Sequence, residues 1–183
     1  DQEILFLCHW DEKHNVWTRY FQKVYPHILS KDINDIYRKN NFLYVATDHG
    51  LLIFDIINEK WELIDVSSAL SSNQINKIDS KGNILYLSTL KGITQLSTEI
   101  NKIIPTSFYG INHRNIYDIL IFEDKYYILS EVGLLLVNDG KQYIISNKKF
   151  NNIDLFDGKI ILSEGNNIYK LVEDKKIEIL MKY

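Results

Sequence analysis

The chain has 183 residues, of which 45% are hydrophobic and 25% are charged, and its formal net charge is -3. This composition is typical of a globular domain, and the near-neutral charge excludes the strongly basic surface that nucleic-acid binding usually requires. Every apolar run is far shorter than the roughly 20 residues that cross a membrane as a helix, so we expect no direct membrane insertion. The single cysteine, Cys8, excludes an intramolecular disulfide and a multi-cysteine zinc site.

The N-terminal region contains two short apolar segments that are predicted to be strands. Trp10-Asp11 lies seven residues before Trp17, just as Phe54-Asp55 lies seven residues before Trp61. We therefore interpret the N-terminal pair as the third and fourth strands of a four-stranded unit, with Trp17 equivalent to Trp61, and expect it to pack against the next unit. The two strands are predicted over 3–10 and 16–22.

The rest of the chain contains an internal repeat. Four apolar segments end in a small residue, at spacings of 42, 42 and 33 residues: Ala46, Ser88, Ser130 and Ser163. An aliphatic residue lies ten positions before each of them: Ile36, Ile78, Leu120 and Ile153. A glycine follows the first three after four, four and three positions: Gly50, Gly92 and Gly133. Agreement at several offsets indicates repeated structural units.

Each unit is predicted to form four short antiparallel strands. In the first copy, runs rich in Ile, Val, Tyr and Phe are separated by turns rich in Asn, Asp and Gly, which is the pattern of consecutive hairpins. These strands are predicted over 33–38, 42–47, 51–56 and 61–65. Asp-Gly pairs at 139–140 and 157–158 suit tight hairpin turns, and we expect positive φ at Gly50 and Gly92. The best helical candidate, Val66–Leu70, is too short to be stable alone.

Four-stranded units at a period near 42 residues favour an all-β fold, a β-propeller with about four full blades and an N-terminal half-blade, with a β-sandwich as the alternative. The chain would form a single propeller domain or part of a larger propeller. Either the ring closes with a two-stranded blade, or it stays open and is completed by another chain or further sequence; we favour the second. The blades are predicted at about 1–24 (half), 31–66, 73–107, 114–147 and 150–181.

Two stretches, Ile33–Asp55 and Leu70–Ile93, resemble the two-component regulator propeller repeat. That repeat has an Ile-x-x-Ile strand, a Gly-Asn-type turn, an aromatic strand ending in Gly-Thr, and then Gly-Leu. Here Ala46 or Ser88 replaces the glycine before Thr. The resemblance implies an extracytoplasmic sensory propeller of bacterial hybrid sensors or envelope proteins, in the periplasm or at the cell surface. It also implies a protein or glycan partner and no chemistry, and it carries over no ligand-binding residue.

We expect ligand contacts in the loops, because loops on a rigid scaffold carry function more often than strands. The candidate residues lie in the turns between second and third strands and in the connectors between blades: Asp48, His49, Lys91, Glu131, Tyr109, His113 and Arg114. Asp48 beside His49 invites an acid–base interpretation, but an Asp that caps a turn next to an exposed His is the simpler one and the one we favour.

No catalytic residue, metal site or cofactor is predicted. The five histidines are scattered, with no His-x-His or His-x-x-x-His pair, and no phosphate-binding glycine loop or nucleophile motif occurs. We therefore expect a non-enzymatic recognition module. The alternatives are a structural scaffold in a larger assembly, with association through an open blade edge, and, less favoured, a propeller hydrolase or lyase.

Overall fold

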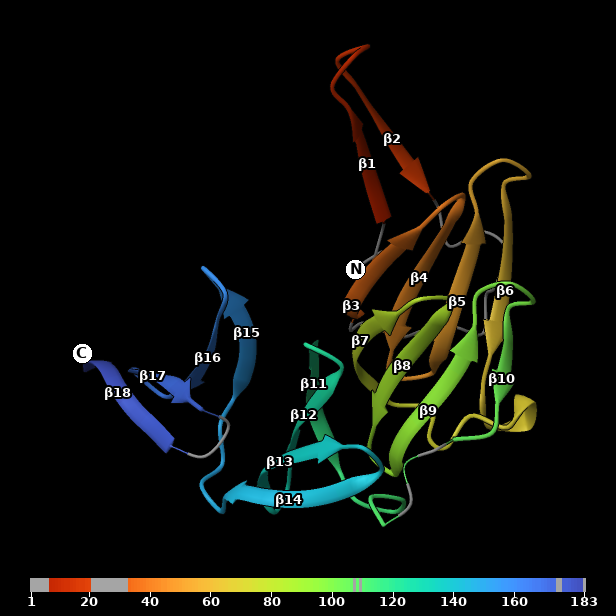
Figure 1. Cartoon of the computed structure of the whole chain (residues 1–183). Coiled ribbons are helices and arrows are strands. Elements are labelled where there is room, and N and C mark those ends of the chain that lie inside the picture. Colours follow the sequence, from red (N-terminus) through yellow and green to blue (C-terminus); the bar gives the residue numbers. More distant parts are fainter. Residues whose placement is uncertain (1–6, 21–32, 107, 109, 174–175, 183) are drawn as a thin grey trace, which may run out of the picture.

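A computed structural model describes residues 7–20, 33–106, 108, 110–173 and 176–182. It contains four four-stranded antiparallel sheets, each made of consecutive strands, and one two-stranded sheet. The sheets, which we call blades 1 to 4, follow one another along an open arc (Figure 1). The predicted all-β propeller-blade fold is confirmed, and within the described residues the arc does not close into a ring.

The bounds of the strands are as follows. Blade 1 contains β3 (Ile33–Lys39), β4 (Phe42–Thr47), β5 (Gly50–Asp55) and β6 (Lys60–Ile64). Blade 2 contains β7 (Ile75–Lys81), β8 (Ile84–Thr89), β9 (Gly92–Ser97) and β10 (Lys102–Ile104). Blade 3 contains β11 (Ile116–Phe122), β12 (Lys125–Ser130), β13 (Gly133–Asn138) and β14 (Lys141–Ser146). Blade 4 contains β15 (Asn152–Phe156), β16 (Lys159–Glu164), β17 (Asn167–Val172) and β18 (Lys176–Lys182). Between β6 and β7 the segment that was the best helical candidate forms only a single 3-10 turn, Val66–Ser68.

The core consists of three apolar layers, one between each pair of neighbouring blades. Because side chains alternate between the faces of a strand, each blade buries one set of residues against the blade before it and another against the blade after it. Tyr44 and Ile53 of blade 1 pack with Ile78 and Leu87 of blade 2, for example. Similar clusters join blades 2 and 3 and blades 3 and 4. Burial between sheets therefore holds the arc together.

Aspartates on the first strand of each blade add a second connection between neighbours. One carboxylate oxygen of Asp35 accepts a hydrogen bond from the backbone N–H of Ile78 in blade 2, at 2.9 Å. Asp79 likewise accepts from Ile121 of blade 3, at 2.7 Å. These first strands have no neighbour on their inner edge, so the carboxylates satisfy backbone donors that no strand pairs with.

A β-bulge at the start of these strands makes a further repeated contact. The register shifts between Ile33 and Asp35 and again between Ile75 and Lys77. The extra residues are Asn34 and Asn76, whose side-chain amides donate to the first strand of the next blade, to Ile75 O at 2.8 Å and to Ile116 O at 2.6 Å. The bulge thus directs an amide across the boundary between blades.

The N-terminal sheet consists of β1 (Leu7–Asp11) and β2 (Val16–Tyr20). Trp10 lies opposite Trp17 in the same register as Phe54 opposite Trp61. The turns also match. The Asp11 carboxylate accepts a hydrogen bond from His14 N and lies 2.6 Å from His14 Nδ1. In blade 1 the Asp55 carboxylate accepts hydrogen bonds from Asn58 N and, at 2.6 Å, from Asn58 Nδ2. This hairpin therefore has the local structure of the third and fourth strands of a blade, as predicted.

The hairpin was expected to pack against blade 1, but Trp17 makes no such buried contact. Trp17 is 63% exposed, whereas its equivalent Trp61 is half-buried against Phe54. In Figure 1 the hairpin (red) extends beyond the end of blade 1. A two-stranded hairpin without the other two strands of its blade has little apolar surface to bury. Residues 3–6 and 21–22 of the two predicted strands lie outside the described residues.

Candidate functional site

The predicted ligand-binding residues that the structure describes belong to one end of the blades. Because consecutive strands are antiparallel, the turn between the second and third strands lies at the same end as the connector from the fourth strand to the next blade. We call this end the tip face. It is formed by the turns 48–49, 90–91, 131–132 and 165–166, by the connectors 65–74 and 147–151, and by the described residues 105–106, 108 and 110–115 of the connector between blades 2 and 3.

A repeated hydroxyl holds three of these turns in the same shape. Thr47 Oγ1 donates to the carbonyl of Gly50 at 2.8 Å and accepts from His49 N at 3.1 Å. Thr89 makes the same two bonds in blade 2, and Ser130 makes them in blade 3. The hydroxyl residues are buried, so each turn has a fixed internal frame that does not depend on its two tip residues.

This frame corrects the alignment of the third repeat. Ser130 was aligned with Ala46 and Ser88, but its hydrogen bonds make it the equivalent of Thr47 and Thr89, one position later. The shift accounts for the glycine that follows after three residues in this copy and after four in the others. In blade 4 the equivalent position is Glu164, which lies opposite Asn167 across the turn.

The glycines after these turns have positive φ, as predicted for Gly50 and Gly92. Their φ angles are 132° and 106°, and that of Gly133 is 115°. A Cβ atom at Gly133 would lie 2.1 Å from the carbonyl oxygen of Ser146 on β14, so a side chain does not fit. The fourth strand can therefore approach the turn closely only because a glycine is present.

Asp48 and His49 do not form a catalytic pair within the described residues. The half-buried Asp48 carboxylate accepts a hydrogen bond from the Asn34 amide at 2.9 Å, and that amide also donates to the Ile75 carbonyl. His49 is exposed. Asp48 thus fastens the tip of blade 1 to the bulge of its own first strand, and its carboxylate has no hydrogen bond to His49 among the described residues.

The connector between blades 2 and 3 brings four of the candidate residues together. His113 N donates to the carbonyl of Lys91 at 3.3 Å, and Arg114 follows directly. Glu131 N donates to the carbonyl of Asn115 at 3.1 Å. His113, Lys91 and Glu131 are exposed and Arg114 is half-buried, so these residues form a polar patch with two cationic groups, one carboxylate and one imidazole. We call Lys91, His113, Arg114 and Glu131 the connector patch; Tyr109 lies outside the described residues.

Sequence reasoning missed a second polar cluster on the tip face. Lys148 Nζ lies 2.7 Å from Glu164 Oε2 and 2.5 Å from the hydroxyl of Tyr169, which itself donates to Glu164 at 2.9 Å. The hydrogen bond with Glu164 raises the pKa of Lys148, and the same bond lowers the pKa of Glu164. The Lys148-Lys149 pair was interpreted as a solvated turn, and no local signal connects it with residues 16 and 21 positions later.

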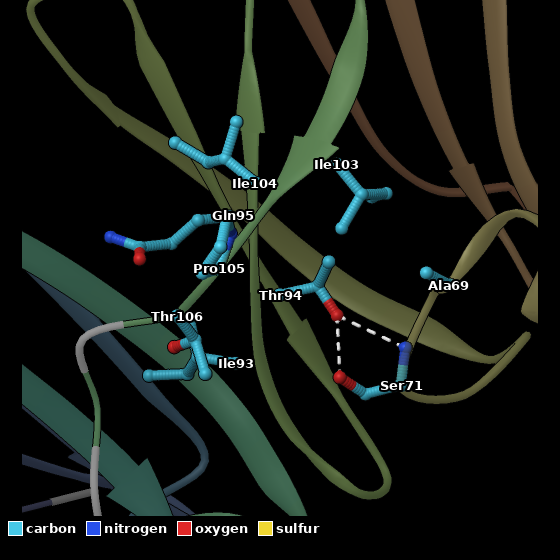
Figure 2. A pocket seen from close by; sticks show the side chains of 9 residues that line it. All are labelled: Ala69, Ser71, Ile93, Thr94, Gln95, Ile103, Ile104, Pro105 and Thr106. Carbon is cyan, nitrogen blue, oxygen red and sulfur yellow. Dashed lines mark hydrogen bonds between the residues drawn. The ribbon is translucent and has the colours of Figure 1, made fainter.

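A pocket of about 390 Å³ lies beside blade 2 at the outer side of the tip face (Figure 2). Pro105 ends β10 after three residues, so β10 pairs only with Gln95, Leu96 and Ser97. Ser71, from the connector before blade 2, donates its backbone N–H to Thr94 Oγ1 at 3.1 Å, and the two hydroxyls lie 2.7 Å apart. The remaining lining is Ala69, Ile93, Gln95, Ile103, Ile104, Pro105 and Thr106. The pocket therefore combines an apolar wall with hydroxyl and amide groups.

Burial, not a ligand, explains the shifted carboxylates between blades. Burial raises the pKa of Asp118 to about 6 and also raises the pKa of Asp79 above its usual range. Both accept backbone hydrogen bonds that oppose this shift. Across the described part of the chain, no group of three or more His, Cys, Asp or Glu side chains is placed to hold a metal ion. No helix in that part is long and apolar enough to cross a membrane.

Comparison with known proteins identifies the architecture. No family model matches the chain, and no curated protein matches it in sequence. Among solved structures, PorZ, a bacterial surface component of the type-IX secretion system of Porphyromonas gingivalis, matches 99% of this chain with a TM-score of 0.74 and 13% identity. The fold is that of a β-propeller. The extracellular domains of BT3049 and BT4673 from B. thetaiotaomicron, described as hybrid two-component systems, match 89% and 83% of the chain.

These last two matches have TM-scores of 0.69, with 16% and 17% identity. The resemblance to the two-component regulator propeller repeat is thus confirmed at the level of the fold. The chain spans about a quarter of the length of these structures, 26% of PorZ, 26% of BT3049 and 22% of BT4673.

Proposed function

We propose that this β-propeller arc is a non-catalytic recognition module of a sensor or envelope protein, and that it binds a glycan or a protein partner through the tip face. The observation that carries the proposal is that the hydrogen bonding inside the tip-face turns is constant whereas the two residues at the tip of each turn vary. The hydroxyl-to-glycine frame recurs in blades 1 to 3, whereas the tip residues change from Asp48-His49 to Leu90-Lys91 to Glu131-Val132. A constant frame with varied tips suits recognition, because chemistry would require particular groups in fixed positions.

Two features of the tip face support ligand binding. The connector patch offers exposed cationic and anionic groups on a segment that is fixed by backbone hydrogen bonds. The neighbouring pocket beside Thr94 has hydroxyl and amide groups on an apolar wall, which is the usual lining of a site for a small polar ligand. The extracellular sensor domains that share the fold agree with this proposal.

A glycan array and a pull-down from an envelope extract test the proposal, using the purified protein and three variants. We expect Lys91→Ala and His113→Ala to weaken binding at least about tenfold, since each removes a tip-face group. Lys141→Ala, an exposed lysine that begins β14 at the opposite end of blade 3, is the matched control and should leave binding unchanged. Equal binding by all variants contradicts a tip-face site, and substrate turnover that one point mutation abolishes contradicts a non-catalytic module.

A scaffold role is the second candidate, and the outer strands favour it. Tyr143 and Ile144 on β14 are 49% and 61% exposed, and Ile179 on β18 is 51% exposed. Exposed apolar side chains on the outermost strands suit contact with another protein. Ile144→Asp should then abolish partner capture while the tip-face variants retain it.

A further inference from the structure

The guanidinium of Arg114 has no partner for its charge in the part of the chain that the structure describes. Arg114 lies just before β11 and is half-buried, yet its side chain makes neither a hydrogen bond nor an ion pair among the described residues. Two half-buried lysines of blade 2 are paired: Lys77 Nζ lies 3.9 Å from an oxygen of Asp35, and Lys81 Nζ lies 2.7 Å from one of Asp124. Removing a cation partly from water costs free energy unless an acceptor compensates it, and Arg114 lacks this compensation.

The same contrast holds within the tip face. Lys148, on the connector between blades 3 and 4, contacts the carboxylate of Glu164 and the hydroxyl of Tyr169, so its charge is compensated inside the protein. Arg114 lies on the preceding connector, between blades 2 and 3, and the one carboxylate of the connector patch, that of Glu131, makes no ion pair with it. One cation of the tip face is therefore used internally, and another is available to a ligand.

The backbone that carries Arg114 is held on both sides. Ile111 is 1% exposed in the apolar layer between blades 2 and 3, and its carbonyl accepts a hydrogen bond from Arg114 N at 3.2 Å. On the other side the fully buried Ile116 begins β11, and its carbonyl accepts from the side-chain amide of Asn76 on blade 2 at 2.6 Å. Because the segment is already ordered, a ligand that binds the guanidinium loses little entropy in fixing it.

Lys91 brings a second cation to the same place. Its carbonyl accepts from His113 N at 3.3 Å, so the tip of blade 2 contacts the residue directly before Arg114. Lys91 is exposed, and its side chain has no ion pair among the described residues. The opposing charge is Glu131, whose backbone N donates to the carbonyl of Asn115 at 3.1 Å. With its two cations and one carboxylate, the connector patch is positive in a chain whose net charge is -3.

We propose that Arg114 binds a carboxylate from an acidic segment of a protein partner, with Lys91 as the second cationic contact. This step rests on the proposed recognition through the tip face and specifies its ligand. The planar guanidinium can donate two parallel hydrogen bonds to one carboxylate. A phosphate group carries more negative charge and would be repelled more strongly by Glu131, so a single carboxylate suits the patch better.

A peptide fits these residues better than an acidic glycan. Leu90, beside Lys91 at the tip of blade 2, is 37% exposed, and the half-buried Val132 follows Glu131 at the tip of blade 3. These aliphatic side chains flank the charged groups and offer contacts to the apolar neighbours of an Asp or Glu in a peptide. A sugar ring would gain most from a flat aromatic side chain, and the connector patch and these two neighbours contain none.

Peptide arrays and titrations with the purified protein test the proposal. One array carries short end-blocked peptides with a single Asp or Glu among neutral residues, and the matched array carries Asn or Gln instead. We expect the protein to prefer the acidic array, and the tightest acidic peptide to shift the NMR signal of Arg114 Nε. Arg114→Gln should weaken binding of that peptide at least about tenfold, because a charge-assisted hydrogen bond is lost. Arg38→Gln, an exposed arginine on β3, is the matched control and should bind as the wild type does.

Two further measurements establish the sign and the contact. Glu131→Gln should tighten binding of the acidic peptide about two- to fivefold, since it removes a like charge that faces the ligand. In Arg114→Gln, exchanging the acidic residue of the peptide for its amide should have no further effect, as expected when the two groups contact each other.

Three results overturn the carboxylate proposal: no preference for the acidic array, wild-type affinity in Arg114→Gln, or weaker binding in Glu131→Gln. Binding of a uronic-acid oligosaccharide through Arg114 without binding of acidic peptides also overturns it, and would identify a glycan as the ligand. The proposed function is tested separately by Lys91→Ala and His113→Ala with the glycan array and the envelope extract. A neutral ligand that these two variants lose and Arg114→Gln retains would preserve recognition through the tip face and contradict the carboxylate.

Discussion

The carboxylate of Asp118 accepts a hydrogen bond from the backbone N–H of Ile153, 3.3 Å away on the next blade. Asp118 is only 6% exposed, and burial raises its pKa to about 6. The bridge between blades 3 and 4 therefore uses a group whose charge is costly in its surroundings.

This cost predicts a pH dependence of stability. Because the pKa of Asp118 is higher in the folded state than its unfolded value near 3.9, the folded protein loses stability as the pH rises from about 4 to about 6. Asp118→Asn removes the titrating carboxylate but keeps only one of the two acceptor oxygens that bond to Ile119 N and Ile153 N, so its free energy of unfolding should vary less between pH 4 and pH 7 than that of the wild type. Urea unfolding between pH 4 and pH 7 measures this. Wild-type and variant curves that run parallel over this range would refute the role of Asp118; Asp139→Asn, at an exposed turn, is the control.

Replacing different turn glycines by alanine should lower the free energy of unfolding by different amounts. Gly133→Ala should cost more than about 2 kcal/mol, because it combines positive φ with a Cβ 2.1 Å from Ser146 O. Gly140→Ala, at φ 70° with no atom within 4 Å of its Cβ, should cost about 1 kcal/mol. The free energy of unfolding from denaturant titration gives both values. Similar losses at the two positions would show that backbone strain alone matters.

Neighbouring hydroxyls in blade 2 should respond in opposite directions. Thr89 Oγ1 is buried and makes both hydrogen bonds of the turn frame, so Thr89→Val should lower the free energy of unfolding by about 1–3 kcal/mol. The buried Ser88 hydroxyl has no partner among the described residues, so Ser88→Ala should leave stability unchanged or raise it slightly. Thermal unfolding of the two variants side by side decides the matter, and a large loss in Ser88→Ala would mean that this hydroxyl has a partner.

The equivalent residues Trp61 and Trp17 should contribute differently to the stability of the protein. Trp61 stacks on the buried Phe54 with ring centroids 4.5 Å apart, so Trp61→Ala should lower the free energy of unfolding by about 2–4 kcal/mol. Trp17 is 63% exposed, and Trp17→Ala should change the stability of the blades by less than about 0.5 kcal/mol. Chemical denaturation followed by circular dichroism measures both, and an equal loss would show that the N-terminal hairpin is packed as firmly as blade 1.

The sequence predicted the features that depend on neighbouring residues. Alternating apolar strands and glycine-containing turns are local signals, and so is the spacing that makes Trp10-Asp11…Trp17 equivalent to Phe54-Asp55…Trp61. The positive φ of Gly50 and Gly92 was predicted for the same reason.

Contacts between blades could not be predicted in this way. Asp35 and Asp79 bridge to the next blade from different positions in their repeats, so no recurring residue marks the bridge in the sequence. The alignment of Ser130 depended on a hydrogen bond to Gly133, which a comparison of small residues does not reveal. Lys148 and Glu164 meet only because the connector folds back over blade 4.

The order of strands within the sheets has a consequence for how the chain acquires its structure. Every sheet is made of segments that are adjacent in the sequence, so pairing partners are separated by short loops and little chain entropy is lost on closing them. Each repeat can form its hairpins during synthesis before the following one exists. Duplication or loss of a whole repeat during evolution would leave the hydrogen-bonded ladders of the remaining sheets intact and alter only the two surfaces on either side.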